Sequence, residues 1–136
     1  MKNPVERLVE RLIHGDSQKA ALVFSEKNRF YFTQFPASDG ALLVTAEEAY
    51  LLMDFRYEEA AHYKAKYCTV VGFDSLLGKL GELIQKHGIK QIYLETEQLS
   101  VAQARRFEAS FQKVGAEVVL DDTLDSAIRD QRMIKS

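Results

Sequence analysis

The chain has 136 residues, of which 46% are hydrophobic and 28% charged, and this is enough for one domain with its own core. Its formal net charge of −2 argues against a nucleic-acid binder, because such domains normally carry a basic excess. No apolar stretch approaches the roughly 18 residues of a membrane span, so we expect no membrane association. The single cysteine, Cys68, excludes an intrachain disulfide and fits a reducing, cytoplasmic location.

The first half of the chain predicts one helix followed by closely spaced strands. Asn3 and Glu6 have the spacing of a capping box at the start of that helix. The polar run 25–28 predicts a hairpin turn, and the run 34–39 predicts a loop. Strands are expected at 20–24, 29–33, 41–45 and 50–53. Their short connections favour antiparallel pairing.

The second half alternates helices and strands. Helices are expected at 55–66, from a cap at Asp74 to Gly88, from a capping box at Ser100 to 111, and from 122 or 123 onward. Strands are expected at 69–71, 91–94 and 117–120. This alternation implies crossover connections, so the predicted fold class is α/β, a mixed parallel and antiparallel sheet with helices on its faces. The last helix lacks a stop signal, and we expect a longer protein to continue beyond Ser136.

Three acidic residues offer the best case for chemistry within the chain. Asp54, Glu95 and Asp121 each follow a predicted strand directly. If these strand ends lie side by side, their carboxylates can hold Mg²⁺ for a nuclease reaction. Acids in such positions also serve as caps of the next element, which is the alternative interpretation. The chain shows no zinc-protease, phosphate-loop or nucleophile-elbow motif, so no catalytic residue is assigned.

Four stretches carry a more specific pattern. They are Asn28-Arg29-Phe30-Tyr31-Phe32-Thr33-Gln34-Phe35, the run from Ser38-Asp39-Gly40 to Thr45, the run from Tyr50 through Asp54-Phe55-Arg56-Tyr57 to Ala60, and Arg132-Met133-Ile134-Lys135-Ser136. Together they resemble the N-terminal domain shared by creatinase, prolidase and aminopeptidase P. Two positions depart from that family's pattern, since Gln34 and Phe55 stand where it often has glycine.

The resemblance implies a ribonuclease H-like fold over residues 1–136 and a function without catalysis in this chain. In such enzymes a C-terminal "pita-bread" domain, expected after residue 136, binds two divalent metals (Mn, Co or Zn) and hydrolyses short proline-containing peptides. The N-terminal domain contributes to a homodimer interface and forms one wall of the substrate pocket. The resemblance therefore points to an Xaa-Pro dipeptidase or Xaa-Pro aminopeptidase whose own catalytic domain is the main partner of this one.

Five residues within the matching stretches are candidates for the pocket wall or interface: Phe35, Ser38, Asp54, Arg56 and Tyr57. The loop that holds Phe35 and Ser38 has the composition to present an aromatic edge to a ligand. Asp54 is placed to cap the next helix, and Arg56 can fork onto a carboxylate. The favoured alternative is that Asp54 and Arg56 only tie neighbouring loops together, without contacting a substrate. Two other functions stay open at this point, a stand-alone binding module and the Mg²⁺ nuclease.

Overall fold

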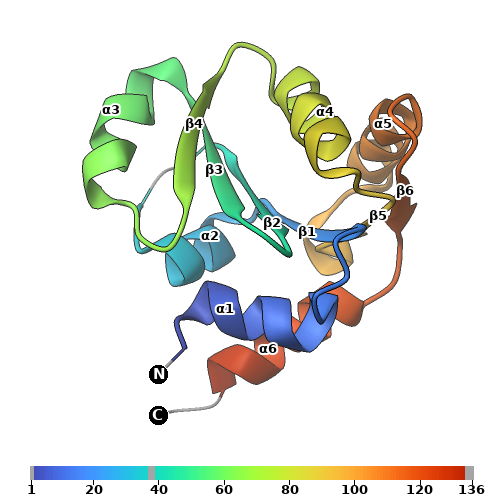
Figure 1. Cartoon of the computed structure of the whole chain (residues 1–136), viewed down its shortest axis with the longest axis horizontal. Coiled ribbons are helices and arrows are strands. Elements are labelled where there is room, and N and C mark those ends of the chain that lie inside the picture. Colours follow the sequence, from blue (N-terminus) through green and yellow to red (C-terminus); the bar gives the residue numbers. More distant parts are fainter. Residues whose placement is uncertain (1, 37–38, 134–136) are drawn as a thin grey trace.

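A computed structural model describes residues 2–36 and 39–133, and it forms a six-stranded sheet with helices on both faces (Figure 1). The strands are β1 (Lys19–Val23), β2 (Ala41–Thr45), β3 (Ala49–Asp54), β4 (Thr69–Phe73), β5 (Gln91–Leu94) and β6 (Glu117–Val119). Their order across the sheet is β4-β3-β2-β1-β5-β6. Strand β2 runs antiparallel to β1 and β3, whereas the pairs β3–β4, β1–β5 and β5–β6 are parallel. The mixed sheet predicted from the sequence is confirmed.

This topology brings the carboxyl ends of five strands to one edge of the sheet. Only β2 runs the other way, so the segments that follow β1, β3, β4, β5 and β6 all begin along the same edge. Ligand sites of open α/β sheets are generally found at such an edge. The segments after β1, β3 and β5 also hold most of the residues that the resemblance and the carboxylate hypothesis singled out.

The alternating residues of the central strands divide the core into two halves. Ala21 and Val23 of β1 face one half, and Ala20 and Leu22 face the other. The first half is covered by the helices α1 (Pro4–Leu8) and its π-helical continuation η1 (Val9–Ile13), α2 (Glu26–Thr33), α3 (Phe55–Lys64) and α6 (Thr123–Met133). The second half is covered by α4 (Leu76–His87) and α5 (Val101–Gln112). Each fully buried leucine or phenylalanine in these layers contributes roughly 1.5–3 kcal/mol to stability.

The predicted helix ends are largely as expected. The capping boxes of α1 at Asn3 and of α5 at Ser100 are both complete, and Gly88 ends α4 in the left-handed conformation. One cap is corrected, since Ser75 rather than Asp74 accepts the hydrogen bond from the backbone of α4. Among the described residues, no helix combines the length and apolar character needed to cross a membrane.

The segment 25–33 corrects the predicted hairpin turn and aromatic strand, because it forms the helix α2. Arg29, Phe32 and Thr33 are its buried residues, and their spacing of three and four places them on one helical face. In a strand, Phe30 and Phe32 would point to the same face, but Phe30 is 49% exposed whereas Phe32 is fully buried. Gln34 ends the helix in the left-handed conformation with φ of 60°, which is the backbone geometry that usually selects glycine.

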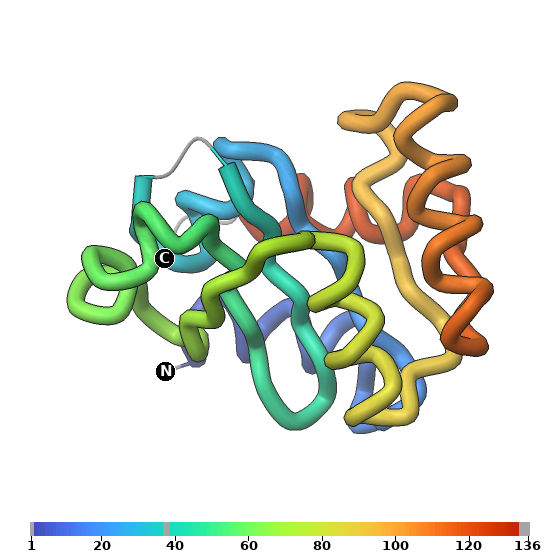
Figure 2. Tube along the Cα trace, turned by 90° about the horizontal axis from the view of Figure 1, so that it is seen from above, coloured from blue at the N-terminus to red at the C-terminus, as the bar shows by residue number. Residues whose placement is uncertain are grey.

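Helices α1 and α6 lie side by side beneath the sheet and join the two ends of the described chain (Figure 1). The side-chain amide of Gln131 donates to the Pro4 carbonyl oxygen at 2.7 Å, and Arg11 pairs with Asp130 at 2.7 Å. Helix α6 is therefore anchored to the domain along its length. The view from above shows α3, in green, and α5, in orange, toward opposite ends of the sheet (Figure 2).

Candidate functional site

The loop after α2 returns to the sheet at a position where only glycine fits. Gly40 has φ of +126°, and a Cβ atom added there would lie 2.5 Å from the carbonyl oxygen of Leu52 in β3. Both the conformation and the contact exclude a side chain, because real Cβ atoms do not approach a backbone oxygen so closely. The end of this loop is thus pressed against β3, two residues before the strand ends at Asp54.

A buried arginine holds the same loop from the other side. Arg29 of α2 is 3% exposed, and its Nε donates to the carbonyl oxygen of Phe24 at 3.0 Å. Its Nη1 donates to the carbonyl oxygen of Asp39 at 3.0 Å. Desolvation lowers the pKa of the Arg29 guanidinium, although the neighbouring carboxylates of Glu26, Asp39 and Glu95 oppose this shift. The side chain bridges the end of β1 and the end of the loop.

The turn from β3 into α3 lies next to this loop and displays an exposed ion pair. Asp54 Oδ1 accepts from the backbone N–H of Arg56 at 3.0 Å and from Arg56 Nε at 3.1 Å. These hydrogen bonds lower the pKa of Asp54, and the Asp54 carboxylate raises the pKa of Arg56, with a smaller contribution from Asp39. The Arg56 guanidinium lies 5.5 Å from the centre of the Tyr57 ring. Since the Arg56 side chain is 71% exposed, its remaining N–H groups face solvent.

The predicted site residues are therefore brought together only in part. Asp54, Arg56 and Tyr57 form one corner, and Tyr57 also packs against the core. The prediction that Phe35 presents an aromatic edge is corrected, because its ring is 7% exposed and belongs to the core beneath the loop. Burial of an aromatic ring stabilises the fold, and Phe35 enters the core directly after the turn at Gln34. Ser38 lies outside the described residues.

The carboxylate of Glu95, just after β5, is fully buried and has a structural task. Its Oε1 accepts from the backbone N–H groups of Phe24 at 2.6 Å and Ser25 at 2.8 Å. Its Oε2 accepts from the Ser25 hydroxyl at 2.6 Å and from Asn28 Nδ2 at 2.7 Å. Four donors thus surround a side chain with 0% exposure, as a buried charge requires.

This arrangement overturns the hypothesis of a Mg²⁺ nuclease. Glu95 offers no free oxygen to a metal, and β5 is three strands away from β3, which corresponds to about 14 Å between their ends. Asp121 is engaged locally, since its Oδ1 accepts from the backbone N–H of Thr123 at 2.9 Å. Across residues 2–36 and 39–133, no three His, Cys, Asp or Glu side chains are grouped so as to hold a metal ion. Asp54 caps α3, and Asp121 accepts from the first residue of α6, so both have local structural roles, close to the alternative that their positions allowed.

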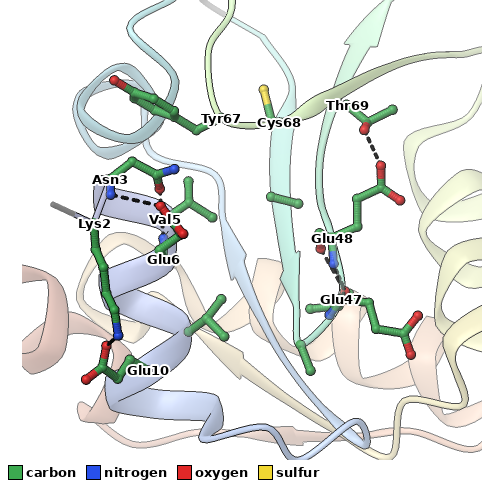
Figure 3. A pocket seen from close by; sticks show the side chains of 14 residues that line it. Lys2, Asn3, Val5, Glu6, Glu10, Glu47, Glu48, Tyr67, Cys68 and Thr69 are labelled. Atoms are coloured by element: carbon green, nitrogen blue, oxygen red, sulfur yellow. Dashed lines mark hydrogen bonds and ion pairs between the residues drawn. The ribbon is translucent and has the colours of Figure 1, made fainter.

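A surface hollow of about 580 Å³ lies between the start of α1, the β2–β3 turn and the start of β4 (Figure 3). Its polar side chains pair with one another, Lys2 with Glu10 and Thr69 with Glu48. Burial raises the pKa of the Cys68 thiol on its wall to about 11, so this cysteine is a poor nucleophile at neutral pH. Charged and polar side chains in the hollow are thus paired with each other, and its described residues include no activated nucleophile.

A family model for the creatinase/prolidase N-terminal domain matches residues 5–134 of the chain. The chain belongs to this family. A putative Xaa-Pro aminopeptidase from Mycoplasma genitalium is 29% identical over 93 residues, which are 68% of this chain and 26% of that protein. The matched part of the chain therefore spans about a quarter of the length of these curated relatives.

Two solved structures show the same fold. The X-Pro aminopeptidase from Thermotoga maritima superimposes with a TM-score of 0.83 at 24% identity, over 99% of this chain and 37% of that one. The N-terminal domain of the cytoplasmic peptidase PepQ from Mycobacterium tuberculosis superimposes with a TM-score of 0.76 at 23% identity, over 93% of this chain and 99% of that one. This second structure contains the N-terminal domain by itself.

The structure of this creatinase/prolidase-type domain explains the two departures from the family's pattern. Gln34 adopts the left-handed conformation that the usual glycine would favour, so the chain keeps the turn at some cost in free energy. Phe55 is the first residue of α3, where the backbone is helical and no glycine is needed. No local pattern signals the structural roles of Arg29 and Glu95, because their hydrogen-bond partners lie outside their own elements.

Proposed function

We propose that this chain is the non-catalytic N-terminal domain of a two-metal Xaa-Pro peptidase. The observation that carries the proposal is the family match over residues 5–134, together with relatives named putative Xaa-Pro aminopeptidases, of which the match covers only 26%. A match confined to a quarter of such a protein leaves the greater part of it for catalysis. We place the catalytic region after residue 136 and the protein in the cytoplasm as a homodimer.

The metals of the parent enzyme belong to that other region. The described residues of this domain do not fit a metal pair, since no three ligand-type side chains gather in them. The buried Glu95 already has four donors, and the Asp54 carboxylate accepts from the Arg56 backbone and side chain. No step of the hydrolysis therefore passes through this domain, and the two divalent ions (Mn, Co or Zn) would be bound elsewhere in the parent.

The contribution of this domain would be a wall of the substrate pocket at the carboxyl edge of the sheet. The loop from Gln34 to Gly40 is fixed at both ends, and the corner of Asp54, Arg56 and Tyr57 stands beside it. An exposed guanidinium held by a capping carboxylate is well suited to receive the carboxylate of a short peptide, since its free N–H groups form a planar fork. Such a wall would bind and orient a proline-containing peptide without taking part in bond cleavage.

A direct test compares this chain with the gene product that extends beyond Ser136. Both are incubated with added Mn²⁺ or Co²⁺, and the release of proline from an Xaa-Pro dipeptide and of the first residue from an Xaa-Pro-Yaa tripeptide is measured. We expect activity in the longer protein alone, and the preferred substrate distinguishes a dipeptidase from an aminopeptidase. Activity of the isolated chain would refute a non-catalytic role. Inactivity of both would favour a stand-alone binding module.

The wall itself is tested with Arg56→Ala in the longer protein, with Arg105→Ala as the matched control. Both arginines are exposed and lie on helices, but Arg105 is on α5, on the opposite face of the sheet. We expect Arg56→Ala to raise KM about tenfold with little change in kcat, because a lost ion pair to the substrate weakens binding by about 1.4 kcal/mol. Equal kinetics for the two variants would remove Arg56 from the pocket.

A further inference from the structure

Two residues of the matching stretches, Asn28 and Arg132, meet in space although 104 positions separate them. Arg132 Nη1 donates to Asn28 Oδ1 at 2.9 Å, and the guanidinium lies 5.5 Å from the centre of the Tyr31 ring. On its other side, Asn28 donates from Nδ2 to the buried carboxylate of Glu95 at 2.7 Å. The Asn28 amide therefore joins the end of α6 to the end of β5.

Helix α2 also carries the anchor of the pocket loop. Arg29, the next residue, donates to the carbonyl oxygen of Asp39 at the end of that loop. Neighbouring residues of a helix point about 100° apart, so Asn28 and Arg29 reach two different parts of the domain from one rigid element. The loop of the proposed pocket wall and the helix that ends the described chain are thus both fixed to α2.

We propose that Asn28, through Arg132, is a positioning residue that fixes the direction in which α6 leaves the domain relative to the pocket loop. This inference rests on the proposed function, because the direction matters only if a catalytic region follows α6. The amide group is suited to the task, since it must accept from Arg132 and donate to Glu95 at the same time. An aspartate would place a second carboxylate against Glu95, and an alanine would leave both partners without it.

The first arm of the test uses the chain as it is and measures amide hydrogen exchange of residues 129–133 by NMR. We expect Asn28→Ala and Arg132→Ala each to accelerate exchange there about three- to tenfold, as the loss of one charge-assisted hydrogen bond at a helix end predicts. In the double variant the acceleration should be smaller than the product of the two single effects, because the hydrogen bond that both substitutions remove can be lost only once. Arg129→Ala is the matched control in the same helix, because Arg129 pairs with Glu97 instead. Its effect should multiply with that of Asn28→Ala.

Independent effects of Asn28→Ala and Arg132→Ala on exchange would overturn the link, and so would unchanged exchange in both. Arg132 is exposed, so its substitution leaves the core intact even if Asn28→Ala impairs folding.

The second arm measures Xaa-Pro peptide hydrolysis by the longer gene product. We expect Asn28→Ala to raise KM about fivefold or more while kcat changes less than twofold, because a misplaced wall weakens binding rather than chemistry. Ile89→Val, which trims the buried core on the other face of the sheet, controls for a general loss of stability and should leave KM unchanged. Coupled exchange with an unaltered KM would overturn the positioning role while keeping the link. If the longer gene product without substitutions shows no peptidase activity, the proposed function is refuted. The hydrogen-exchange measurement would then still decide whether Asn28 and Arg132 are linked.

Discussion

Replacement of Glu95 by glutamine tests how strongly a single buried carboxylate organises this domain. Both carboxylate oxygens accept two hydrogen bonds each, from Phe24, Ser25 and Asn28. Glutamine has nearly the same shape but turns one of the two acceptors into a donor. If the glutamine oxygen faces the backbone N–H groups, its NH₂ group meets the Ser25 hydroxyl, which can rotate, and the Asn28 amide, which already donates toward it.

The expected loss follows from the number of hydrogen bonds that fail. At least one charge-assisted bond is lost and one buried donor is left without an acceptor, which predicts a destabilisation of about 2–4 kcal/mol. For a domain of this size, each kcal/mol lowers Tm by roughly 3–5 °C, so we expect a decrease of about 6–20 °C. Urea unfolding followed by circular dichroism gives the free energy, and a thermal scan gives Tm.

Glu108→Gln is the matched control, since it removes the same charge from an exposed position of α5. Exposed substitutions of this kind usually change stability by less than about 0.5 kcal/mol. If Glu95→Gln unfolds at the same urea concentration as Glu108→Gln, the buried carboxylate does not organise the start of α2, and the reasoning is refuted.

Three further predictions concern stability and reactivity. Gly40→Ala should destabilise the domain by about 2–4 kcal/mol in urea unfolding. Gly81→Ala, inside α4, should instead stabilise it by about 0.5–1 kcal/mol, because the added Cβ atom would lie at an ordinary contact distance of 3.6 Å from Val114. Burial raises the pKa of Asp125 despite the hydrogen bonds that its carboxylate accepts, so the charged form opposes folding. Asp125→Asn should therefore be more stable than the unaltered chain at pH 7. This gain should be complete above the raised pKa and vanish below about pH 4, which urea unfolding at several pH values will measure. Cys68, with its pKa raised to about 11, should react with an aromatic disulfide at pH 8 about 100-fold more slowly in the native chain than in the denatured one.

Local signals in the sequence predicted those parts of the fold that local chemistry determines. The capping boxes at Asn3 and Ser100 and the stop at Gly88 depend on residues within one turn of the helix end, so their patterns can be found by spacing alone. The order of helices and strands in the second half follows from hydrophobic periodicity and turn residues. The mixed sheet then follows from which strands have short connections and which have helical crossovers.

The helix α2 was not predictable in this way. Its run of aromatic residues has strand propensity, and its eight residues are too few for a clear amphipathic pattern. Tertiary contacts override this strand preference, because the Glu95 carboxylate accepts hydrogen bonds from polar groups at the start of the helix. Glu95 is 67 residues away from Asn28, so a local pattern does not reveal this contact. The same long-range origin explains why Phe35 looked like a ligand contact and is a core residue. A loop sequence does not reveal which way its side chains turn.

The stretches that carry the resemblance include Asn28 and Arg132, although neither was among the predicted site residues and the hydrogen bond between them could not be predicted. Such a stretch can be recognised by its residue types even where its secondary structure is predicted wrongly, because Asn28 and Arg29 are defined by the groups that they bind. Asn28 and Arg29 are adjacent in sequence and serve two directions, so inserting one residue before them would rotate both by about 100° and break both attachments. Extra residues within the loop 34–40 would leave both in place. We therefore expect insertions in the loop 34–40 to be tolerated better than insertions between Ser25 and Arg29.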